Sequence, residues 1–241
     1  YLMYGENSEY LTELTDKEVY YMDIASLKGD LTRAANYEAK IFYTGTLPFD
    51  DAYTILSQNL PLVANERPSN SPQVREMAQA TENTIFFLPN NDAEQAQIHF
   101  YLPMQAADKK DDVLRDAFNQ YFGIGFTGLV LNEIREKRSM AYTAYAHAST
   151  QGISNKASCL IGYIGTQNDK ANEAVEVFMG LVNDMPEYSD RIDNIKSYLR
   201  QEALTSHPSF RSKAMSLVSL ELMGYTDDPA KENLAKIDAL T

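Results

Sequence analysis

The sequence has little of what several common kinds of functional site require. Of its 241 residues, three are histidine, one is cysteine, and 21 are Lys or Arg against 34 Asp or Glu, which gives a net charge of −13. Nucleic acids, through their phosphate backbones, and anionic membranes bind to basic surfaces, so this charge argues against both as partners. Because Cys159 stands alone, no disulfide can form within the sequence. The compartment stays open between a bacterial envelope and the cytoplasm.

Long apolar runs are also missing, and the sequence predicts no insertion into a membrane. The first residue is Tyr1, and no basic region followed by an apolar stretch comes after it, so residues 1–13 do not form a signal peptide. We expect the chain to have been processed or cut from something larger.

Metal and nucleophile motifs are absent as well. His99, His147 and His207 lie far apart and form no His-x-x-His, His-Glu-x-x-His or His-x-x-Glu-His pattern. One cysteine excludes a thiolate zinc site, although a metal site assembled from distant histidines and carboxylates stays open. No Gly-x-Ser-x-Gly elbow is present. Cys159 follows Ser158 in an apolar stretch, which is typical of a buried structural thiol.

A short glycine-rich run, Gly123 to Gly128 (GIGFTG), resembles a phosphate-binding loop only superficially. It lacks the lysine of such a loop and does not follow a predicted strand. We interpret these glycines as allowing a tight corner between two helices.

Local patterns predict how the chain is organised. Hydrophobic residues make up 44%, which is ordinary for a globular protein. Residues 1–13 are interpreted as a lead-in or linker, and residues 14–241 as a single domain. Thr15 and Glu18 match a capping box that begins a helix over about 16–28, ending at Gly29.

The remaining elements are predicted from periodicity and turn residues. The sequence between Pro61 and Ala80 indicates an exposed connection. Strands are expected over 37–44, 83–88, 94–102, 141–148 and 156–164, with a hairpin joining 83–88 to 94–102. Helices are expected over about 50–59, 111–122, 127–137, from 168 onward, 189–205, 208–224 and 228–239. Ala171, Ala174, Val175, Phe178 and Val182 mark an apolar helical stripe.

This order favours an α+β fold. We predict an antiparallel sheet of about five to six strands, packed against helices on one face, with a helical C-terminal extension.

The most informative stretch runs from Leu131 to Ala148 (LNEIREKRSMAYTAYAHA). It predicts a helix with a basic end, a turn at Ser139-Met140, and a strand. Glu133 and Lys137 stand four apart and are expected to pair, while cations at a helix C-terminus are favoured by its dipole. These roles are purely structural, and Tyr142 could equally be an ordinary strand aromatic.

The segment from Phe126 to Tyr142 (FTGLVLNEIREKRSMAY) resembles the helix–turn–strand segment of the pitrilysin and insulin-degrading-enzyme family of zinc metallopeptidases. In that family an Arg and a Tyr stand seven positions apart, as Arg135 and Tyr142 do here. The order of elements over about 14–240 is also similar, and the resemblance is to the non-zinc domain. It therefore implies a clamshell domain from the half that closes over the substrate.

The resemblance implies a definite role for this chain. Zinc would be bound by a His-x-x-Glu-His motif in a missing N-terminal half or a partner subunit, and no cofactor is expected here. Arg135 would bind the substrate backbone, and Tyr142 would donate to the oxygen that becomes negative during peptide hydrolysis. We expect Tyr142 to share a strand face with Ala144 and Ala146, whose small side chains leave it room, and Tyr145 to face the core.

One position departs from the family pattern, and two other functions stay open. The residue before Met140 is often Gly in the family and is Ser139 here, so the conformation of this turn is left for the structure to decide. The first alternative function is a non-catalytic partner or scaffold subunit of the same fold. The second is an unrelated α+β ligand-binding module, since a fold does not fix a function.

Overall fold

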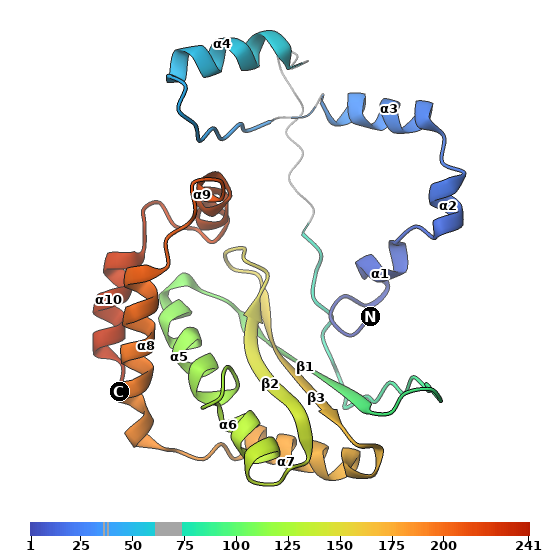
Figure 1. The fold of residues 1–241 in the computed structure, drawn as a ribbon, viewed down its shortest axis with the longest axis vertical. Coiled ribbons are helices and arrows are strands. Elements are labelled where there is room, and N and C mark those ends of the chain that lie inside the picture. Colours follow the sequence, from blue (N-terminus) through green and yellow to red (C-terminus); the bar gives the residue numbers. More distant parts are fainter. Residues whose placement is uncertain (36, 38, 61–73) are drawn as a thin grey trace. The chain divides into compact units, whose positions relative to one another are not determined.

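A computed structural model of the chain describes residues 1–35, 37, 39–60 and 74–241 (Figure 1). The chain divides into two compact units. The larger unit contains Leu2, Met77–His207 and Val218–Thr241, and the smaller one contains Tyr1, Met3–Glu76 and Pro208–Leu217. The interpretation of residues 14–241 as one domain stays a prediction.

The smaller unit is helical in the part that the structure describes. Its N-terminal part contains α1 (Glu9–Thr12), α2 (Asp16–Tyr20), α3 (Ile24–Ala34) and α4 (Phe49–Asn59), with a 3₁₀ turn at Gly5–Asn7. Its segment Pro208–Leu217 contains the first half of α9 (Lys213–Leu222). The predicted capping box is confirmed, because Thr15 Oγ1 accepts from Glu18 N at 3.3 Å and Glu18 Oε2 accepts from Thr15 N at 2.8 Å.

The helix predicted over 16–28 is wrong in extent. The carboxylate of Asp23 accepts hydrogen bonds from Ala25 N at 3.2 Å and Ser26 N at 3.0 Å, so it caps a second helix. Gly29 lies inside that helix rather than at an end. The helix predicted over 50–59 is confirmed by α4. Most of the predicted connection, residues 61–73, lies outside the described residues. Residues 36 and 38 also lie outside them, and residue 38 belongs to the strand predicted over 37–44.

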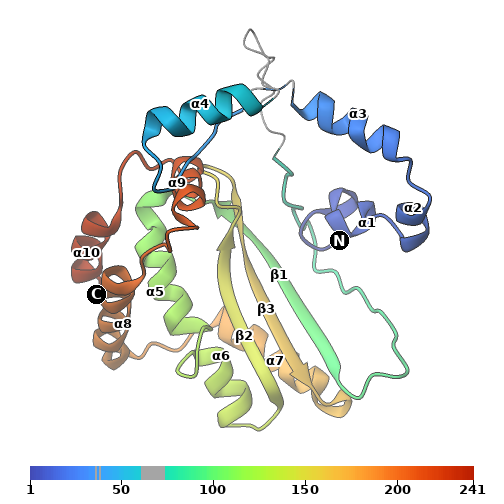
Figure 2. The same cartoon turned by 45° about the horizontal axis from the view of Figure 1, so that its top comes forward.

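Three antiparallel strands form the sheet of the larger unit: β1 (Ala96–Ala106), β2 (Ala141–Thr150) and β3 (Ala157–Thr166). Their order is β1-β3-β2, and Figure 2 shows β3 between the other two. The predicted strands over 94–102, 141–148 and 156–164 are therefore confirmed, and so is the α+β class. The sheet has fewer strands than the five to six expected, as far as the described residues show.

The two missing strands share a physical reason. Residues 39–44 and 83–88 have no regular secondary structure and pair with no strand among the described residues, so the predicted hairpin does not form. Strand propensity provides no partner for the backbone, and β1 pairs with β3 instead. The apolar residues of 83–88 are consecutive rather than alternating. Ile85, Phe87 and Leu88 are accordingly 93%, 83% and 88% exposed.

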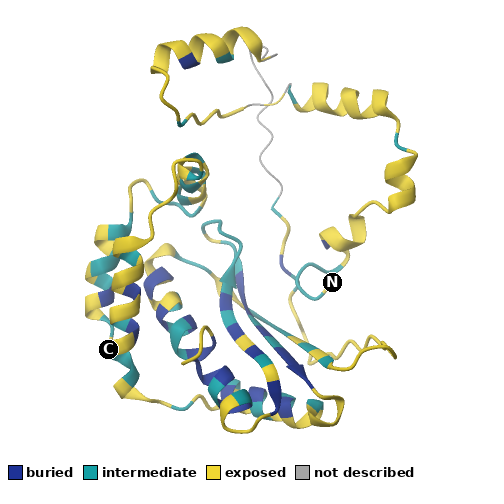
Figure 3. Ribbon diagram, viewed as in Figure 1, coloured by how far each residue is buried: buried dark blue, intermediate teal, exposed yellow. Residues whose placement is uncertain are grey.

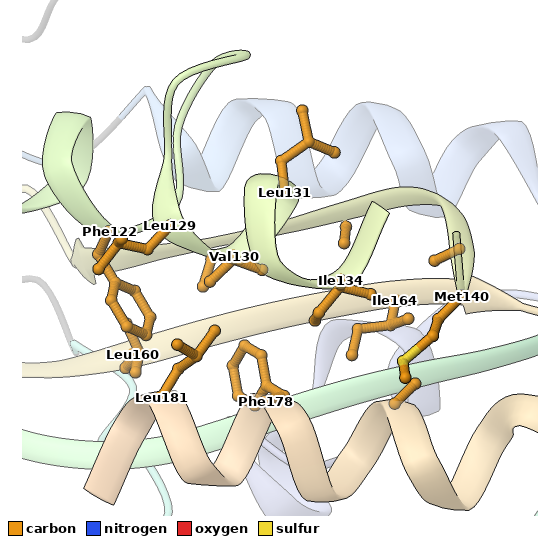
Figure 4. Close-up of a cluster of buried hydrophobic side chains, with 14 residues drawn as sticks. Phe122, Leu129, Val130, Leu131, Ile134, Met140, Leu160, Ile164, Phe178 and Leu181 are labelled. Carbon is orange, nitrogen blue, oxygen red and sulfur yellow. The ribbon is translucent and has the colours of Figure 1, made fainter. Parts of the chain in front are cut away.

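Helices cover one face of the sheet and bury the main core there. They are α5 (Asp112–Phe122), α6 (Leu129–Leu131) and α7 (Ala171–Asn183), and Figure 3 shows buried residues concentrated where they meet the strands. Figure 4 shows the side chains of this core. Phe178 stacks on Phe100 with ring centroids 4.0 Å apart, and it passes so close to Gly162 that a Cβ there would lie 2.6 Å from its Cζ. Ala174 and Phe178 of the predicted apolar stripe are fully buried.

The predicted helical C-terminal extension contains α8 (Ile192–Thr205), α9 and α10 (Ala230–Ala239). A second, smaller cluster of buried residues attaches α8 and α10 to α5. The cluster joins α5 to α8 and α10 through Val113, Ala117, Ile195, Leu199 and Ile237. Among the helices that the structure describes, none is both long and apolar enough to cross a membrane.

Candidate functional site

The helix predicted over 127–137 ends in an unusual, widened turn. After α6 the backbone continues as a π-helical turn, Asn132–Glu136, in which Lys137 N donates to Asn132 O at 2.9 Å. Two further bonds close the end, from Ser139 N to Arg135 O at 2.8 Å and from Met140 N to Ile134 O at 3.0 Å. Such π turns are rare, and they occur often at functional sites.

Ser139 lies at the point where the chain reverses into β2. Its φ is +50°, in the left-handed region that glycine adopts most easily, which explains physically why a glycine suits this position. The next residue is tied down firmly. Met140 is buried, and the hydroxyl of Thr166, itself 1% exposed, donates to its carbonyl. Ile134, Met140 and Ile164 lie together beneath the turn (Figure 4).

Tyr142 occupies a β-bulge at the start of β2. Ala141 pairs with Thr166 and Thr143 pairs with Gly165, so Tyr142 is the extra residue on its strand. The expectation that Tyr142 shares a face with Ala144 and Ala146 is wrong.

The burial of the strand shows the reason. Ala144 and Ala146 are buried against the helices, whereas Tyr142 is 76% exposed. The bulge shifts the alternation by one residue, and the pattern of small side chains could not reveal it. Tyr145 does not face the main core either. It is 40% exposed and lies beside Tyr163, with ring centroids 5.4 Å apart.

Arg135 and Tyr142 meet across the turn. The guanidinium carbon of Arg135 lies 5.3 Å from the centroid of the Tyr142 ring, within the range of a cation–π contact. Arg135 Nε also lies 3.4 Å from Glu136 Oε1. The Arg135 side chain is 36% exposed, so both groups can reach a ligand from solvent.

An open cleft of about 410 Å³ borders this pair. It lies at the end of the sheet where β1 begins, β2 begins and β3 ends. Its lining is Gln95, Arg135, Glu136, Ser139, Met140, Ala141, Tyr142, Gly165, Thr166 and Gln167. The cleft therefore presents a guanidinium, a phenol and amide side chains, which are hydrogen-bond donors suited to carbonyl oxygens.

Beside the cleft, Glu133 binds the other two cations of the turn. Its Oε1 accepts from Lys137 Nζ at 2.5 Å, which confirms the predicted pair, and its Oε2 accepts from Arg138 Nη1 at 2.6 Å. Burial alone would raise the pKa of the Glu133 carboxyl, but the hydrogen bonds from Lys137 and Arg138 outweigh it and hold that pKa below its usual value.

The histidines and the cysteine do not gather into a metal site in the part of the chain that the structure describes. Among the residues that the structure describes, no group of three or more His, Cys, Asp and Glu could hold a metal ion. His99 contacts Tyr163 on the open face of the sheet, with ring centroids 5.0 Å apart, and His147 contacts Tyr145. Cys159 is buried as predicted, and burial raises the pKa of its thiol. The residues present therefore do not fit a zinc ion.

The glycine run at 123–128 forms the predicted helix corner between α5 and α6. A Cβ on Gly123 would lie 2.1 Å from the carbonyl oxygen of Ala146, and Gly123 O accepts from Ala146 N at 3.3 Å. Gly125 has a φ of +76°. These glycines thus serve close packing of α5 on β2.

The sequence predicted Arg135 and Tyr142 as site residues, and this stays a prediction, but it did not predict two of the contacts around their turn. Thr166 holds Met140 from 26 positions away, and no local pattern connects the two. Glu133 was identified only as a partner of Lys137, although Arg138 was visible one position further along. A carboxylate four and five positions before two cations was the available signal.

The chain is similar to known proteins in sequence and in fold. The family model of the peptidase M16 inactive domain matches residues 35–199. The non-peptidase homolog YmxG of Helicobacter pylori is 22% identical over 159 residues, which are 64% of this chain and 35% of that protein.

Two solved structures share the fold. The peptidase M16 inactive domain from Pseudomonas fluorescens matches 100% of this chain and 57% of its own, with a TM-score of 0.65 and 17% identity. A protease from Helicobacter pylori matches 94% of this chain and 55% of its own, with a TM-score of 0.67 and 13% identity. This chain thus spans about a third of the curated relative and just over half of each solved structure.

Proposed function

The chain belongs to the family of the peptidase M16 inactive domain, and from this premise we propose that it is the substrate-closing part of a zinc-dependent peptidase. In this proposal it binds a peptide and assists its hydrolysis, while the zinc belongs to another half of the polypeptide or to a partner subunit. On its own the chain is inactive as a peptidase.

The observation that carries the proposal is the contact between Arg135 and Tyr142 beside the cleft. A purely structural role would bury the ring of Tyr142 in the packed face of its strand. Instead Tyr142 is 76% exposed, on a bulge that takes it out of the packed face of β2. Bulges commonly redirect a side chain next to an active site.

Each side chain has a chemical task in the proposed reaction. Arg135 donates hydrogen bonds to a backbone carbonyl of the bound peptide, beside the bond that is cleaved. Tyr142 donates its phenolic hydrogen to the oxygen that becomes negative as the carbonyl is attacked. The guanidinium beside the Tyr142 ring adds positive charge where that oxygen develops. A donor of this kind typically contributes about 10²–10³ in rate.

The test is the substitution Tyr142→Phe in the complete protein, which contains the zinc-bearing half. We expect kcat to fall about 10²–10³-fold with an unchanged zinc content, because only the donated hydrogen is lost. Tyr145→Phe is the matched control on the same strand, and it should leave kcat unchanged. Full activity of Tyr142→Phe would refute the role assigned to Tyr142.

A second candidate function is a non-catalytic partner or scaffold. The observation in its favour is that the Helicobacter pylori relative is named a non-peptidase homolog. A His-x-x-Glu-His motif in the rest of the polypeptide or in a neighbouring gene favours the enzyme, and its absence from both favours the scaffold.

A further inference from the structure

Three cations lie within four residues at the end of the π turn, yet only one of them contacts Tyr142. Arg135 lies over the Tyr142 ring, while Lys137 and Arg138 bind Glu133. We propose that Glu133 is a positioning residue, which holds Arg135 against Tyr142 by binding the other two cations and fixing the turn that carries them.

The geometry of Glu133 suits this task. Its side chain is only 9% exposed, and each carboxylate oxygen accepts from a different cation, Lys137 at 2.5 Å and Arg138 at 2.6 Å. Arg138 Nη1 also donates to the Glu133 carbonyl at 2.8 Å. The widened turn makes this double contact possible, because it brings residues four and five positions ahead onto the side of Glu133.

Arg135 is excluded from the same carboxylate. Residues two positions apart on a helical turn point in different directions, so Arg135 points away from Glu133. Its nearby carboxylate is that of Glu136, at 3.4 Å from Nε and with a side chain 53% exposed, and such surface pairs hold a guanidinium only weakly. The contact with Tyr142 therefore depends on the backbone of the turn, which Glu133 fixes.

Loss of the Glu133 charge has a predictable consequence. Lys137 and Arg138 would lose their anion, and of the three bonds that they make to residue 133 the one from Arg138 to the backbone carbonyl would remain. Arg135 would then move away from Tyr142. Glu133 itself does not line the cleft, so it acts through Arg135 and not by touching a substrate.

The experiment places 3-fluorotyrosine at position 142 of the full chain and follows its ¹⁹F resonance. Arg135→Ala gives the reference shift for a ring without the guanidinium. We expect Glu133→Gln to move the resonance more than halfway toward that reference, while Glu136→Gln, a matched change of an exposed neighbour, leaves it in place. A wild-type shift in folded Glu133→Gln overturns the proposal.

A second variant keeps the test decisive where Glu133→Gln fails to fold. Lys137 and Arg138 have side chains 52% and 41% exposed, so replacing both by Gln leaves the core intact. The Glu133 carboxylate then lacks both of the cations through which it holds the turn. We expect the resonance to move toward the Arg135→Ala reference, and an unchanged resonance contradicts the proposal.

The catalytic consequence rests on the proposed function. In the complete protein we expect Glu133→Gln to lower kcat about 10²-fold, with a smaller change in KM. The reason is that a displaced Arg135 stabilises the transition state less. Should Tyr142→Phe retain full activity, the proposed function fails, while the ¹⁹F shift still decides whether Glu133 positions Arg135. A Glu133→Gln variant with wild-type kcat and a displaced resonance would overturn the catalytic part alone.

Discussion

The two halves of strand β2 differ in what their residues do. From Ala144 to Thr150 the strand is packed, because Ala144, Ala146 and Ala148 are buried under α5 and α6. From Ala141 to Thr143 it is bulged and carries the exposed Tyr142. The exposed Tyr142 and the buried Ala144 are only two positions apart on the strand. We therefore expect substitutions in the packed half to change stability, and those at the bulged half to change activity.

Gly123, at the end of α5, lets that helix pack closely against the packed half of β2. Its replacement Gly123→Ala puts a Cβ 2.1 Å from the Ala146 carbonyl oxygen, so α5 must move away from β2. We expect a loss of about 3–5 kcal/mol in the free energy of unfolding, measured by denaturant titration. Gly180→Ala is the matched control in an exposed part of α7, where a Cβ meets nothing within 4 Å, and it should stabilise slightly. Equal effects of the two would break the comparison.

Asn119 of α5 links that helix to the packed half of β2 by hydrogen bonds. Its amide accepts from Ala148 N at 2.7 Å and donates to Ala148 O at 3.1 Å, both buried. Asn119→Ala leaves two buried backbone groups without these partners, and we expect a loss of about 2–4 kcal/mol in unfolding free energy. Loss of peptidase activity in the complete protein with unchanged stability would place Asn119 in the site instead.

Glu133 lies in the π-helical turn that precedes the bulged half of β2, and its ion pairs give a pH-dependent effect. Its pKa is lower in the folded chain than in the unfolded one, so its stabilisation is complete above about pH 4.3, the usual Glu value, and is lost as pH falls through the folded pKa. We expect Glu133→Gln to cost about 1.5–3 kcal/mol at pH 7 and progressively less in acid. A gap that stays constant between pH 7 and pH 3 would contradict the ion-pair role.

We expect the smallest change in stability from a substitution of Ser139. Because its φ of +50° costs a residue with a Cβ, Ser139→Gly should raise the free energy of unfolding by up to about 1 kcal/mol. Asn155 has a φ of +59° but tolerates that region better, so Asn155→Gly should change stability less. A loss of stability in Ser139→Gly would show that the serine side chain, and not the backbone, is needed in this turn.

Local signals predicted much of this fold. The capping box of Thr15 and Glu18, helix α4 and strand β1 were predicted from residues within one turn or one element, and the structure confirms them. The strands predicted over 37–44 and 83–88 do not form in the part of the chain that the structure describes, because a strand depends on a partner that no local pattern supplies.

The candidate site was predicted less completely for the same reason. The resemblance to the metallopeptidase family predicted Arg135 and Tyr142 as a pair, and the short turn between them is compatible with the contact that the structure shows. The bulge at Tyr142 could not be predicted, because it arises from the register between β2 and β3. Thr166 was missed because it comes from a different strand than the carbonyl it binds.

The most direct test of the account measures activity and stability on the same variants of the complete protein. Arg135→Ala, Tyr142→Phe and their combination are compared for kcat and for the midpoint of thermal unfolding. We predict that each single change lowers kcat, Tyr142→Phe by about 10²–10³-fold, with a combined loss smaller than the product and unfolding midpoints close to wild type. Wild-type kcat in both single variants, or losses explained by lowered unfolding midpoints, would contradict the claim that this pair serves function and not folding.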